Sequence, residues 1–148
     1  MGGRRRCAGS GEVGLSVRTE VARRALHALA AGEPAAVEAC TTEDYVFHSQ
    51  LDGKPSGRPA LRDRALLLAS ALHEATLSIE LVMEDGDHVA VRWTGRAVHR
   101  GDLVRVPASG RPVEVRGITI FRFVGDLIRE EWTEFDGLGL LSQIAPHD

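Results

Sequence analysis

The sequence contains few of the residues on which several classes of protein depend. Its 148 residues include two cysteines, Cys7 and Cys40, and neither belongs to a CxxC pair. Isolated cysteines of this kind are typical of free thiols in a reducing compartment, so we expect a cytoplasmic protein. The apolar runs are all far shorter than the roughly 20 residues that cross a bilayer, so no membrane partner is expected.

An excess of charge of one sign is also lacking. The 18 Lys and Arg residues nearly balance 21 Asp and Glu residues, which leaves a net charge of -3. This balance provides no basic surface for nucleic acid, and we expect no such partner. Residues 1–15 are rich in Gly and Arg but lack the apolar stretch of a secretory signal. We therefore expect a disordered leader at 1–15 and a single domain at 16–148.

Several catalytic motifs are missing or lack the structural context that they need. The only lysine is Lys54, so there is no GxxxxGK[ST] loop, and no GxSxG is present. Residues 9–14 spell GxGxxG but follow no predicted strand. His73 begins an HExxH pattern whose second histidine position holds Leu77. We expect neither a metal nor a cofactor.

Helical periodicity dominates the first half of the chain. Ser16 is a suitable N-cap for an amphipathic segment that ends before Gly32, and Pro34 suits the first turn of a short second helix. Tyr, Val and Phe then indicate a brief strand before a loop rich in Gly and Pro. The predicted elements are helices at 17–31, 34–40 and 59–72, a strand at 45–48 and a loop at 49–57.

In the second half the apolar period changes to two, which indicates strands. These are predicted at 77–83, 89–94, 113–124 and 127–136, followed by a helical turn at 137–144. Asp85-Gly86 and Gly125-Asp126 are turn signals between successive strands. Helices followed by an antiparallel meander indicate an α+β fold. Strands of this length twist and curl, so we expect a cone with helices in its concavity and an apolar interior.

The segment 128–142 holds the most informative candidate for catalysis. Trp132 lies in a charged strand, and four residues later Asp136 precedes a short apolar helix. Apolar neighbours would desolvate this carboxylate and raise its pKa, which would suit a general base. The alternative is that Asp136 simply caps the helix at 137–144.

Two histidines and the only tyrosine are further candidates. His48 ends the first strand, where it could shuttle protons or hold a loop carbonyl. His99 ends the strand of Trp93 and would share a face with it if no bulge intervenes, although histidines at strand ends are often solvated. Tyr45 begins the YVFH strand and is a candidate for substrate binding.

The remaining candidates are an arginine and two tryptophans. Arg122 lies between two phenylalanines and could bind an enolate oxygen or a carboxylate, or could pair across strands with Glu130 or Glu131. Trp93 and Trp132 could stack on a flat ligand or pack in the core.

Three parts of the sequence resemble the SnoaL-like polyketide cyclase family. They are YVFH at 45–48 with GRPAL at 57–61, GRAVHRG at 95–101 with PASGR at 107–111, and IFRF at 120–123 with the pattern W-x3-D-x2-G-L-L-x-Q-I from Trp132. The resemblance covers about residues 17–145, and its C-terminal pattern is the most specific part.

The resemblance implies an α+β barrel, or cone, of the nuclear transport factor 2 and ketosteroid isomerase type. Members close the last ring of aromatic polyketides by an intramolecular aldol condensation without cofactor or metal. In them the Asp four residues after the Trp is the acid/base group, which implies a catalytic Asp136, with His48 able to help in reprotonation. Arg122 stands near the position where characterised cyclases carry a histidine.

The resemblance also implies a small hydrophobic or aromatic substrate and a homodimer or homotetramer. The family includes hydrolases, hydroxylases and isomerases, and the same cone is reused for non-catalytic binding, so these functions remain alternatives.

Overall fold

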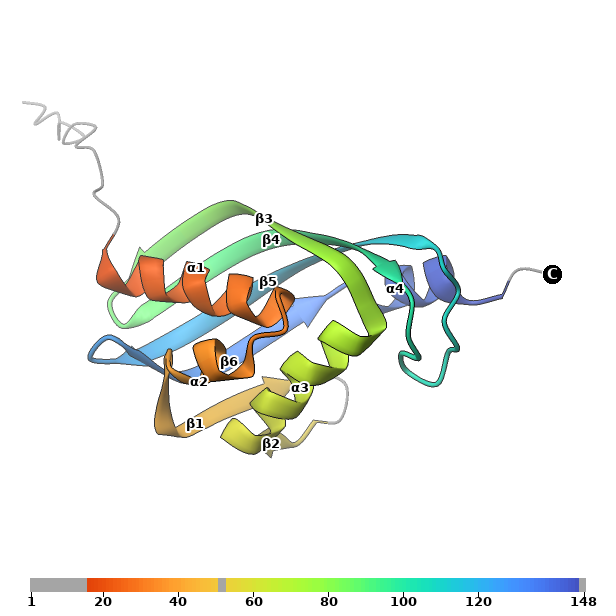
Figure 1. The fold of residues 1–148 in the computed structure, drawn as a ribbon. Coiled ribbons are helices and arrows are strands. Elements are labelled where there is room, and N and C mark those ends of the chain that lie inside the picture. The colour runs from red at the N-terminus through yellow and green to blue at the C-terminus, as the bar shows by residue number, and fades with distance from the viewer. Residues whose placement is uncertain (1–15, 51–52, 147–148) are drawn as a thin grey trace, which may run out of the picture.

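The computed structural model describes residues 16–50 and 53–146, so the predicted leader at 1–15 lies outside the described residues. The elements are α1 (Val17–Ala30), α2 (Pro34–Glu38), β1 (Thr41–Ser49), β2 (Pro55–Ser56), α3 (Arg58–Ala71), β3 (Leu72–Asp85), β4 (His88–His99), β5 (Pro112–Val124), β6 (Leu127–Phe135) and α4 (Gly137–Ile144) (Figure 1). The predicted α+β class is confirmed.

Local chemistry sets the main element boundaries. The Ser16 side chain accepts a hydrogen bond from the backbone N–H of Thr19 at 3.1 Å and caps α1 as predicted. Gly32 follows the helix with a φ of 68°, a conformation that side chains with a Cβ resist. The β3–β4 and β5–β6 hairpins turn at Gly86 and Gly125, whose φ angles are 59° and 60°.

All strands belong to one six-stranded sheet with the order β2-β1-β6-β5-β4-β3. The antiparallel meander from β3 to β6 is as predicted. The early strand β1 lies parallel to β6, with His48 opposite Trp132. β3 begins at Leu72, earlier than predicted, because α3 runs directly into it. A register shift between His73 and Thr76 then bends this strand.

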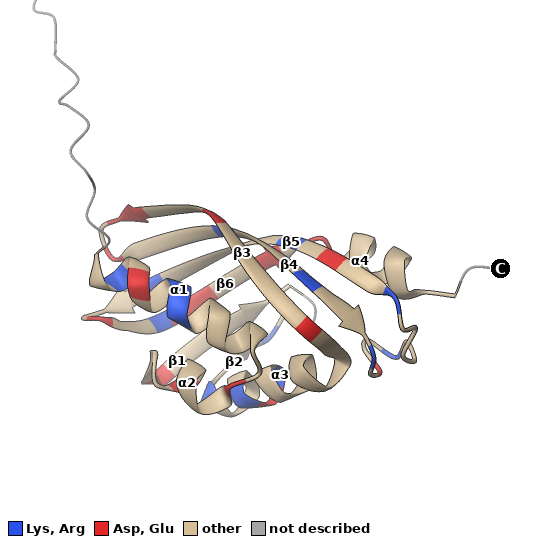
Figure 2. Ribbon diagram, turned by 45° about the horizontal axis from the view of Figure 1, so that its top comes forward, with Lys and Arg blue, Asp and Glu red and all other residues tan. Residues whose placement is uncertain are grey.

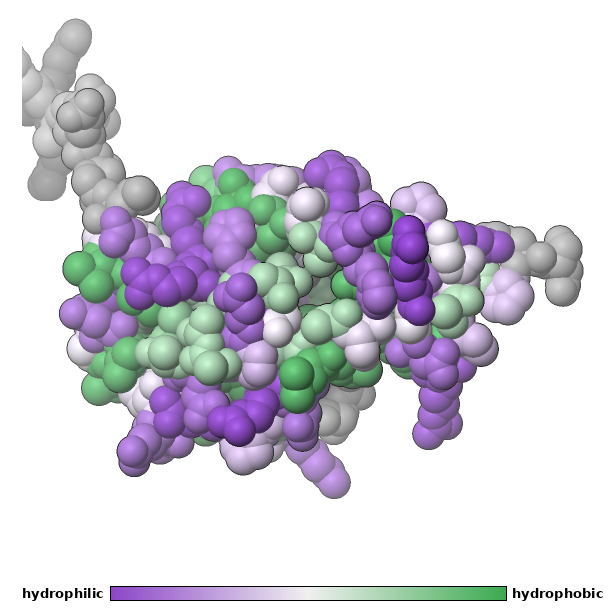
Figure 3. Space-filling model, in the orientation of Figure 1, coloured by the Kyte–Doolittle hydropathy of each residue, from purple (hydrophilic) through white to green (hydrophobic). Residues whose placement is uncertain are grey.

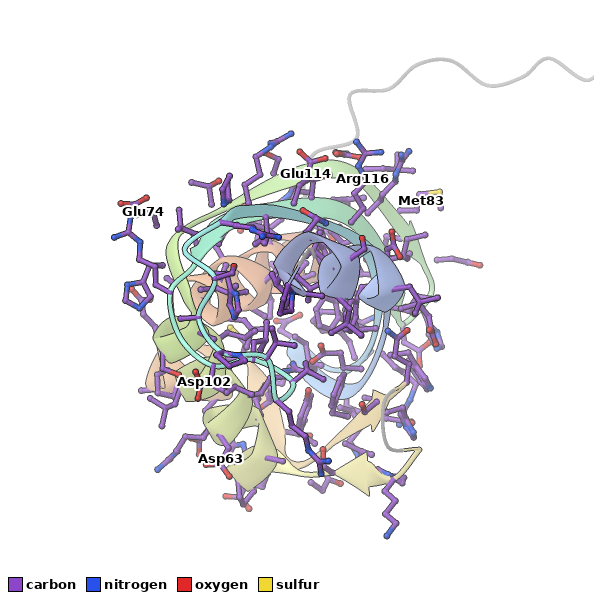
Figure 4. All side chains as sticks on the ribbon, turned by 90° about the vertical axis from the view of Figure 1, so that its right-hand side faces the viewer. Asp63, Glu74, Met83, Asp102, Glu114 and Arg116 are labelled. Carbon is purple, nitrogen blue, oxygen red and sulfur yellow. The ribbon has the colours of Figure 1, made fainter. Side chains whose placement is uncertain are left out.

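The sheet curls around the helices, as predicted for a cone with helices in its concavity (Figure 1). We call the side covered by α1, α2 and α3 the inner face and the opposite side the outer face. Inner-face side chains pack with the helices in a large buried cluster that includes Val91, Phe121 and Phe123. A second buried cluster contains Ala71, Leu103, Val113, Leu140 and Ile144. Figure 4 shows Met83, Glu114 and Arg116 on the outside of the curved sheet.

The inner face is not filled uniformly. Leu77 and Trp93 beside the first cluster, and Val115 and Phe135 beside the second, are only partly buried. A pocket of about 350 Å³ opens where the C-terminal ends of α1 and α3 meet β3, with Ala30, Ala69 and Leu72 in its wall. The surface is hollowed in this part of the molecule (Figure 3). This pocket opens at the surface, and His73, Glu74 and Arg100 also line it.

The outer face carries exposed apolar side chains, among them Leu81, Met83, Ile118 and Ile120. The homodimer or homotetramer expected from the resemblance stays a prediction. Acidic and basic residues are intermixed over the helices and strands (Figure 2). Across the part of the chain that the structure describes, no helix has the length and apolar character needed to cross a bilayer.

Cys40 is a buried free thiol that donates a hydrogen bond to the carbonyl of Ala36 at 3.4 Å. Burial raises the pKa of this thiol, which keeps it protonated and unreactive. The other cysteine lies outside the described residues.

Candidate functional site

The strand register divides the predicted site residues between the two faces of the sheet. The inner group is Tyr45, Trp93 and His99, and the outer group is His48, Arg122 and Trp132. Successive residues of a strand point to opposite faces, so the sheet itself separates the two groups. The predicted residues therefore do not form one site.

The outer group forms a compact cluster around Glu130. His48 Nε2 lies 2.9 Å from one carboxylate oxygen, and Arg122 donates to the other from Nε at 2.8 Å. The His48 ring stacks on Trp132 with a centroid separation of 5.1 Å, and the ring of His88 stacks on Trp132 at 6.3 Å. Arg122 thus pairs across strands with Glu130, which is one of the alternatives that the sequence left open. Trp132 packs between the imidazole rings of His48 and His88.

This cluster should make stability depend on pH. The His48 contact, then Arg122, lowers the pKa of Glu130 below its usual value of 4.5. A carboxylate with a lowered pKa in the folded state stabilises the protein above its unfolded pKa and loses this contribution as pH falls through the folded pKa. Because the Glu130 side chain is 22% exposed, we expect Glu130→Gln to cost about 1 kcal/mol at pH 7 and less at pH 3.

Urea unfolding at several pH values measures this difference, with Glu134→Gln on the same strand and face as the matched control. An equal cost for Glu130→Gln at both pH values would contradict the assignment.

Asp136 does not lie in the environment predicted for it. Its side chain is exposed, and its Oδ1 accepts a hydrogen bond from the backbone N–H of Gly139 at 2.8 Å, which caps α4. It borders an open depression of about 340 Å³ together with Arg92, Arg116 and Glu134. The predicted desolvation is wrong because α4 buries Leu140 and Ile144 while Leu138, near Asp136, is 84% exposed.

The inner face instead holds a buried carboxylate, Glu131, whose exposed fraction is 4%. The hydroxyl of Tyr45 donates a short hydrogen bond to Glu131 Oε2. Arg64 Nη2 donates to both carboxylate oxygens at 3.0 and 3.2 Å, and Thr133 donates to Oε1 at 3.2 Å. Three elements, β1, α3 and β6, thus converge on one acidic group.

Hydrogen bonds extend this network to Trp93. The hydroxyls of Thr133 and Thr119 lie 2.9 Å apart, and the indole Nε1–H of Trp93 donates to Thr119 at 3.0 Å. Thr119 is completely buried. These four side chains therefore form one connected chain of hydrogen bonds from the indole to the carboxylate, which fixes their orientations.

Gly117 makes room for the indole of this network. A Cβ at this position would lie 2.5 Å from the Trp93 ring and 2.8 Å from the carbonyl oxygen of Glu134. We expect Gly117→Ala to lower the free energy of unfolding by about 2 kcal/mol, because the ring or the strand must shift. Gly95→Ala is the matched control on the adjacent strand, since its Cβ would meet no atom closer than 3.9 Å. Urea unfolding of both variants tests this, and equal losses would contradict it.

The electrostatics of the network favour a protonated Tyr45. Burial raises the pKa of its hydroxyl, and the negative charge of Glu131 raises it further. Tyr45 thus keeps its proton at physiological pH and is a hydrogen-bond donor. Arg64 also lies over the ring of Phe47, with 3.9 Å from Cζ to the ring centroid, and its Nε is buried without a partner.

Arg64 is not among the predicted site residues, and Glu131 is predicted only as a partner for Arg122. Strict alternation places Ile128, Glu130 and Trp132 on one face. A register shift opposite Arg122 and Phe123 breaks this alternation, so that Glu131 shares the inner face with Ile128. Arg64 could have been found from the helical stripe that it shares with Leu61 and Leu68.

His99 is a buried inner-face residue, so the solvated alternative for it is wrong. Its Nδ1 accepts a hydrogen bond from the backbone N–H of Ser109 at 3.1 Å and lies 2.9 Å from the hydroxyl of the same residue. These bonds hold the loop between β4 and β5 against the end of the sheet. Its Nε2 is buried without a partner.

Within residues 16–50 and 53–146, no three His, Cys, Asp or Glu side chains converge in a way that could hold a metal ion. The absence of a metal and of a cofactor stays a prediction.

A curled, mostly antiparallel sheet closed over helices, with a buried polar network on its inner face, defines an α+β cone. Residues 19–144 match the SnoaL-like polyketide cyclase family, and the chain belongs to this family. No curated protein matches the sequence.

Solved structures share the fold. TsrD from Streptomyces laurentii is similar, with 25% identity, a TM-score of 0.79 and coverage of 90% of this chain and 98% of that one. IdmH from Streptomyces antibioticus, described as a candidate polyketide cyclase, has 22% identity, a TM-score of 0.74 and coverage of 87% and 99%. AclR from Streptomyces galilaeus, described as a candidate hydroxylase, has 20% identity, a TM-score of 0.79 and coverage of 88% and 82%.

Proposed function

We propose that the protein is a cytoplasmic, cofactor-independent polyketide cyclase that closes a ring by intramolecular aldol condensation through general acid/base catalysis. Family membership supports the reaction class. The main structural support for this proposal is the buried carboxylate of Glu131, which accepts hydrogen bonds from Tyr45 and Arg64 on the inner face. We assign the reaction centre to this group rather than to the exposed Asp136.

Glu131 acts as the general base. It removes an acidic proton from a carbon flanked by two carbonyls of the substrate, and the resulting enolate attacks an internal carbonyl carbon. Arg64 places a positive charge 3.0 Å from the buried carboxylate and fixes its orientation. The surrounding apolar interior excludes water, which strengthens these interactions.

Arg64 and Tyr45 stabilise the negative charge that develops on the oxygens of the substrate. The unpaired Nε–H of Arg64 donates to the enolate oxygen as charge develops there. The new alkoxide takes a proton from the hydroxyl of Tyr45, and the proton held by Glu131 then returns to Tyr45. Proton loss and gain balance, so the product is an isomer of the substrate.

The substrate is a small hydrophobic or aromatic molecule. Phe47, Trp93 and Phe135 are half-buried on the inner face and offer flat apolar surfaces beside the network. Stacking on such rings suits a polycyclic polyketide. The outer cluster of His48, Arg122 and Trp132 is separated from this site by the sheet, so we assign it no catalytic step.

Mass spectrometry of the products tests the reaction class. The purified protein is incubated with an uncyclised aromatic polyketide ester, without added metal or cofactor. A new product of unchanged mass supports ring closure. A gain of one oxygen would instead identify a hydroxylase, a gain of water a hydrolase, and tight binding without turnover a binding protein. Each of these three outcomes would refute the proposal.

A further inference from the structure

Two threonines occupy inner-face positions of the sheet that are surrounded by apolar side chains. Thr119 on β5 and Thr133 on β6 are cross-strand partners, and Thr119 also lies opposite the buried Val91 of β4. Thr119 is completely buried and Thr133 is half-buried. Valine has nearly the shape of threonine, but a buried hydroxyl needs a hydrogen-bond partner. The two hydroxyls therefore stand where an apolar residue of the same size would pack without that requirement.

The ends of the hydrogen-bond chain fix the direction of each bond within it. The indole N–H of Trp93 can only donate, and it donates to Thr119 at 3.0 Å. At the other end the single hydroxyl hydrogen of Thr133 is donated to Oε1 of Glu131 at 3.2 Å. The bond of 2.9 Å between the two hydroxyls must therefore be donated by Thr119. All three bonds point from the indole towards the carboxylate.

Trp93 is the fixed end of this chain. It is the cross-strand partner of Gly117, and a Cβ at position 117 would lie 2.5 Å from its ring. The ring thus lies directly against the backbone of β5, and its other neighbours belong to the large buried cluster. The position of the indole is therefore set by packing, and the two hydroxyls connect it to Glu131.

The carboxylate of Glu131 is held at both of its oxygens. Tyr45 donates to Oε2, Thr133 donates to Oε1, and Arg64 donates to both. The last torsion of a glutamate side chain has a broad energy profile, so its rotamer does not fix the plane of the carboxylate. Donors on both oxygens do fix this plane, and the chain from Trp93 supplies one of them.

We propose that Thr119 and Thr133 are positioning residues for the reaction, which together with Trp93 hold the carboxylate of Glu131 in the plane in which it accepts the substrate proton. This inference rests on the proposed function, since it concerns the group that acts there as the general base. The threonines take part in no proton transfer. They supply the orientation of the base before the substrate arrives, and a misplaced catalytic group slows a reaction without weakening binding.

Valine and serine variants separate the hydroxyl from the volume of the side chain. Thr119→Val and Thr133→Val keep the shape and remove the hydroxyl, and each should lower kcat about tenfold with KM within about twofold of the wild type. Thr133→Ser keeps the hydroxyl and should restore kcat to within about twofold. The matched control is Thr94→Val, because Thr94 is also buried in the sheet but donates to Glu80, outside the chain. A kcat for Thr133→Val equal to that of the control would overturn the proposal.

The indole N–H resonance of Trp93 tests the chain without turnover. The protein has two tryptophans, and the variant Trp132→Phe assigns the two indole signals in a ¹H–¹⁵N spectrum. Glu131→Gln removes the charged acceptor, which weakens the bonds along the chain and should move the Trp93 indole proton to lower chemical shift. In a Thr133→Val background the same replacement should leave this signal in place.

Equal movement of the signal in both backgrounds, or movement in neither, would overturn the proposal whatever the turnover assay gives. Absence of turnover by the wild type would instead count against the proposed function, and the resonance would still decide whether the threonines connect Trp93 to Glu131. The two failures are therefore distinguishable.

Discussion

Replacing Glu131 with Gln should lower kcat/KM for ring closure by about a thousandfold, while Asp136→Asn should leave it within about threefold of the wild type. A positioned general base contributes roughly 100- to 10,000-fold to rate, and the amide cannot accept the proton. Glu131 is 4% exposed and bonded to Tyr45, whereas Asp136 is exposed and caps α4. Kinetics of both variants with a polyketide ester measure the difference.

The two variants test competing assignments. The family resemblance implies Asp136 as the acid/base group, and the structure favours Glu131. Loss of activity in Asp136→Asn with full activity in Glu131→Gln would restore the first assignment and refute ours. Circular dichroism and urea unfolding must show that both variants are folded, since Glu131 also has a structural role in the network.

Replacing Arg64 with Met should lower the free energy of unfolding by about 3 kcal/mol, because it leaves the carboxylate of Glu131 buried without its cationic partner. Arg64 approaches both oxygens of that carboxylate, and the two side chains are 20% and 6% exposed. Methionine keeps most of the volume of the arginine stem, so loss of packing is a minor contribution. Urea unfolding at pH 7 measures the effect.

Two further variants identify the cause of this loss. The double variant Arg64→Met with Glu131→Gln should recover at least half of the stability, because the unpaired charge is then gone. Arg62→Met is the surface control, since Arg62 pairs with Glu38 on the exposed side of α3 and an exposed pair contributes little. A double variant no more stable than Arg64→Met alone would contradict this explanation.

Much of the fold follows from local sequence patterns. The Ser16 cap, the glycine at position 32 and the turns at Gly86 and Gly125 act over a few residues, so the sequence predicts them directly. The change of apolar period from helical spacing to two separates the helices from the meander in the same local way. The pairing of β1 with β6 is different, because it joins segments more than 80 residues apart and no local pattern specifies it.

In the candidate site, too, some features follow from the local sequence and others depend on contacts between distant segments. The sequence alone determined that the chain is an α+β protein with a polar C-terminal strand and an apolar interior, and its motifs indicated the family. Which carboxylate lies inside was decided by the tertiary structure. One register shift in β6 turns Glu131 inward, and the direction of α4 leaves Asp136 in solvent. Burial depends on what packs against a residue from distant elements, and here α3 brings Arg64 to Glu131 across 67 positions of sequence.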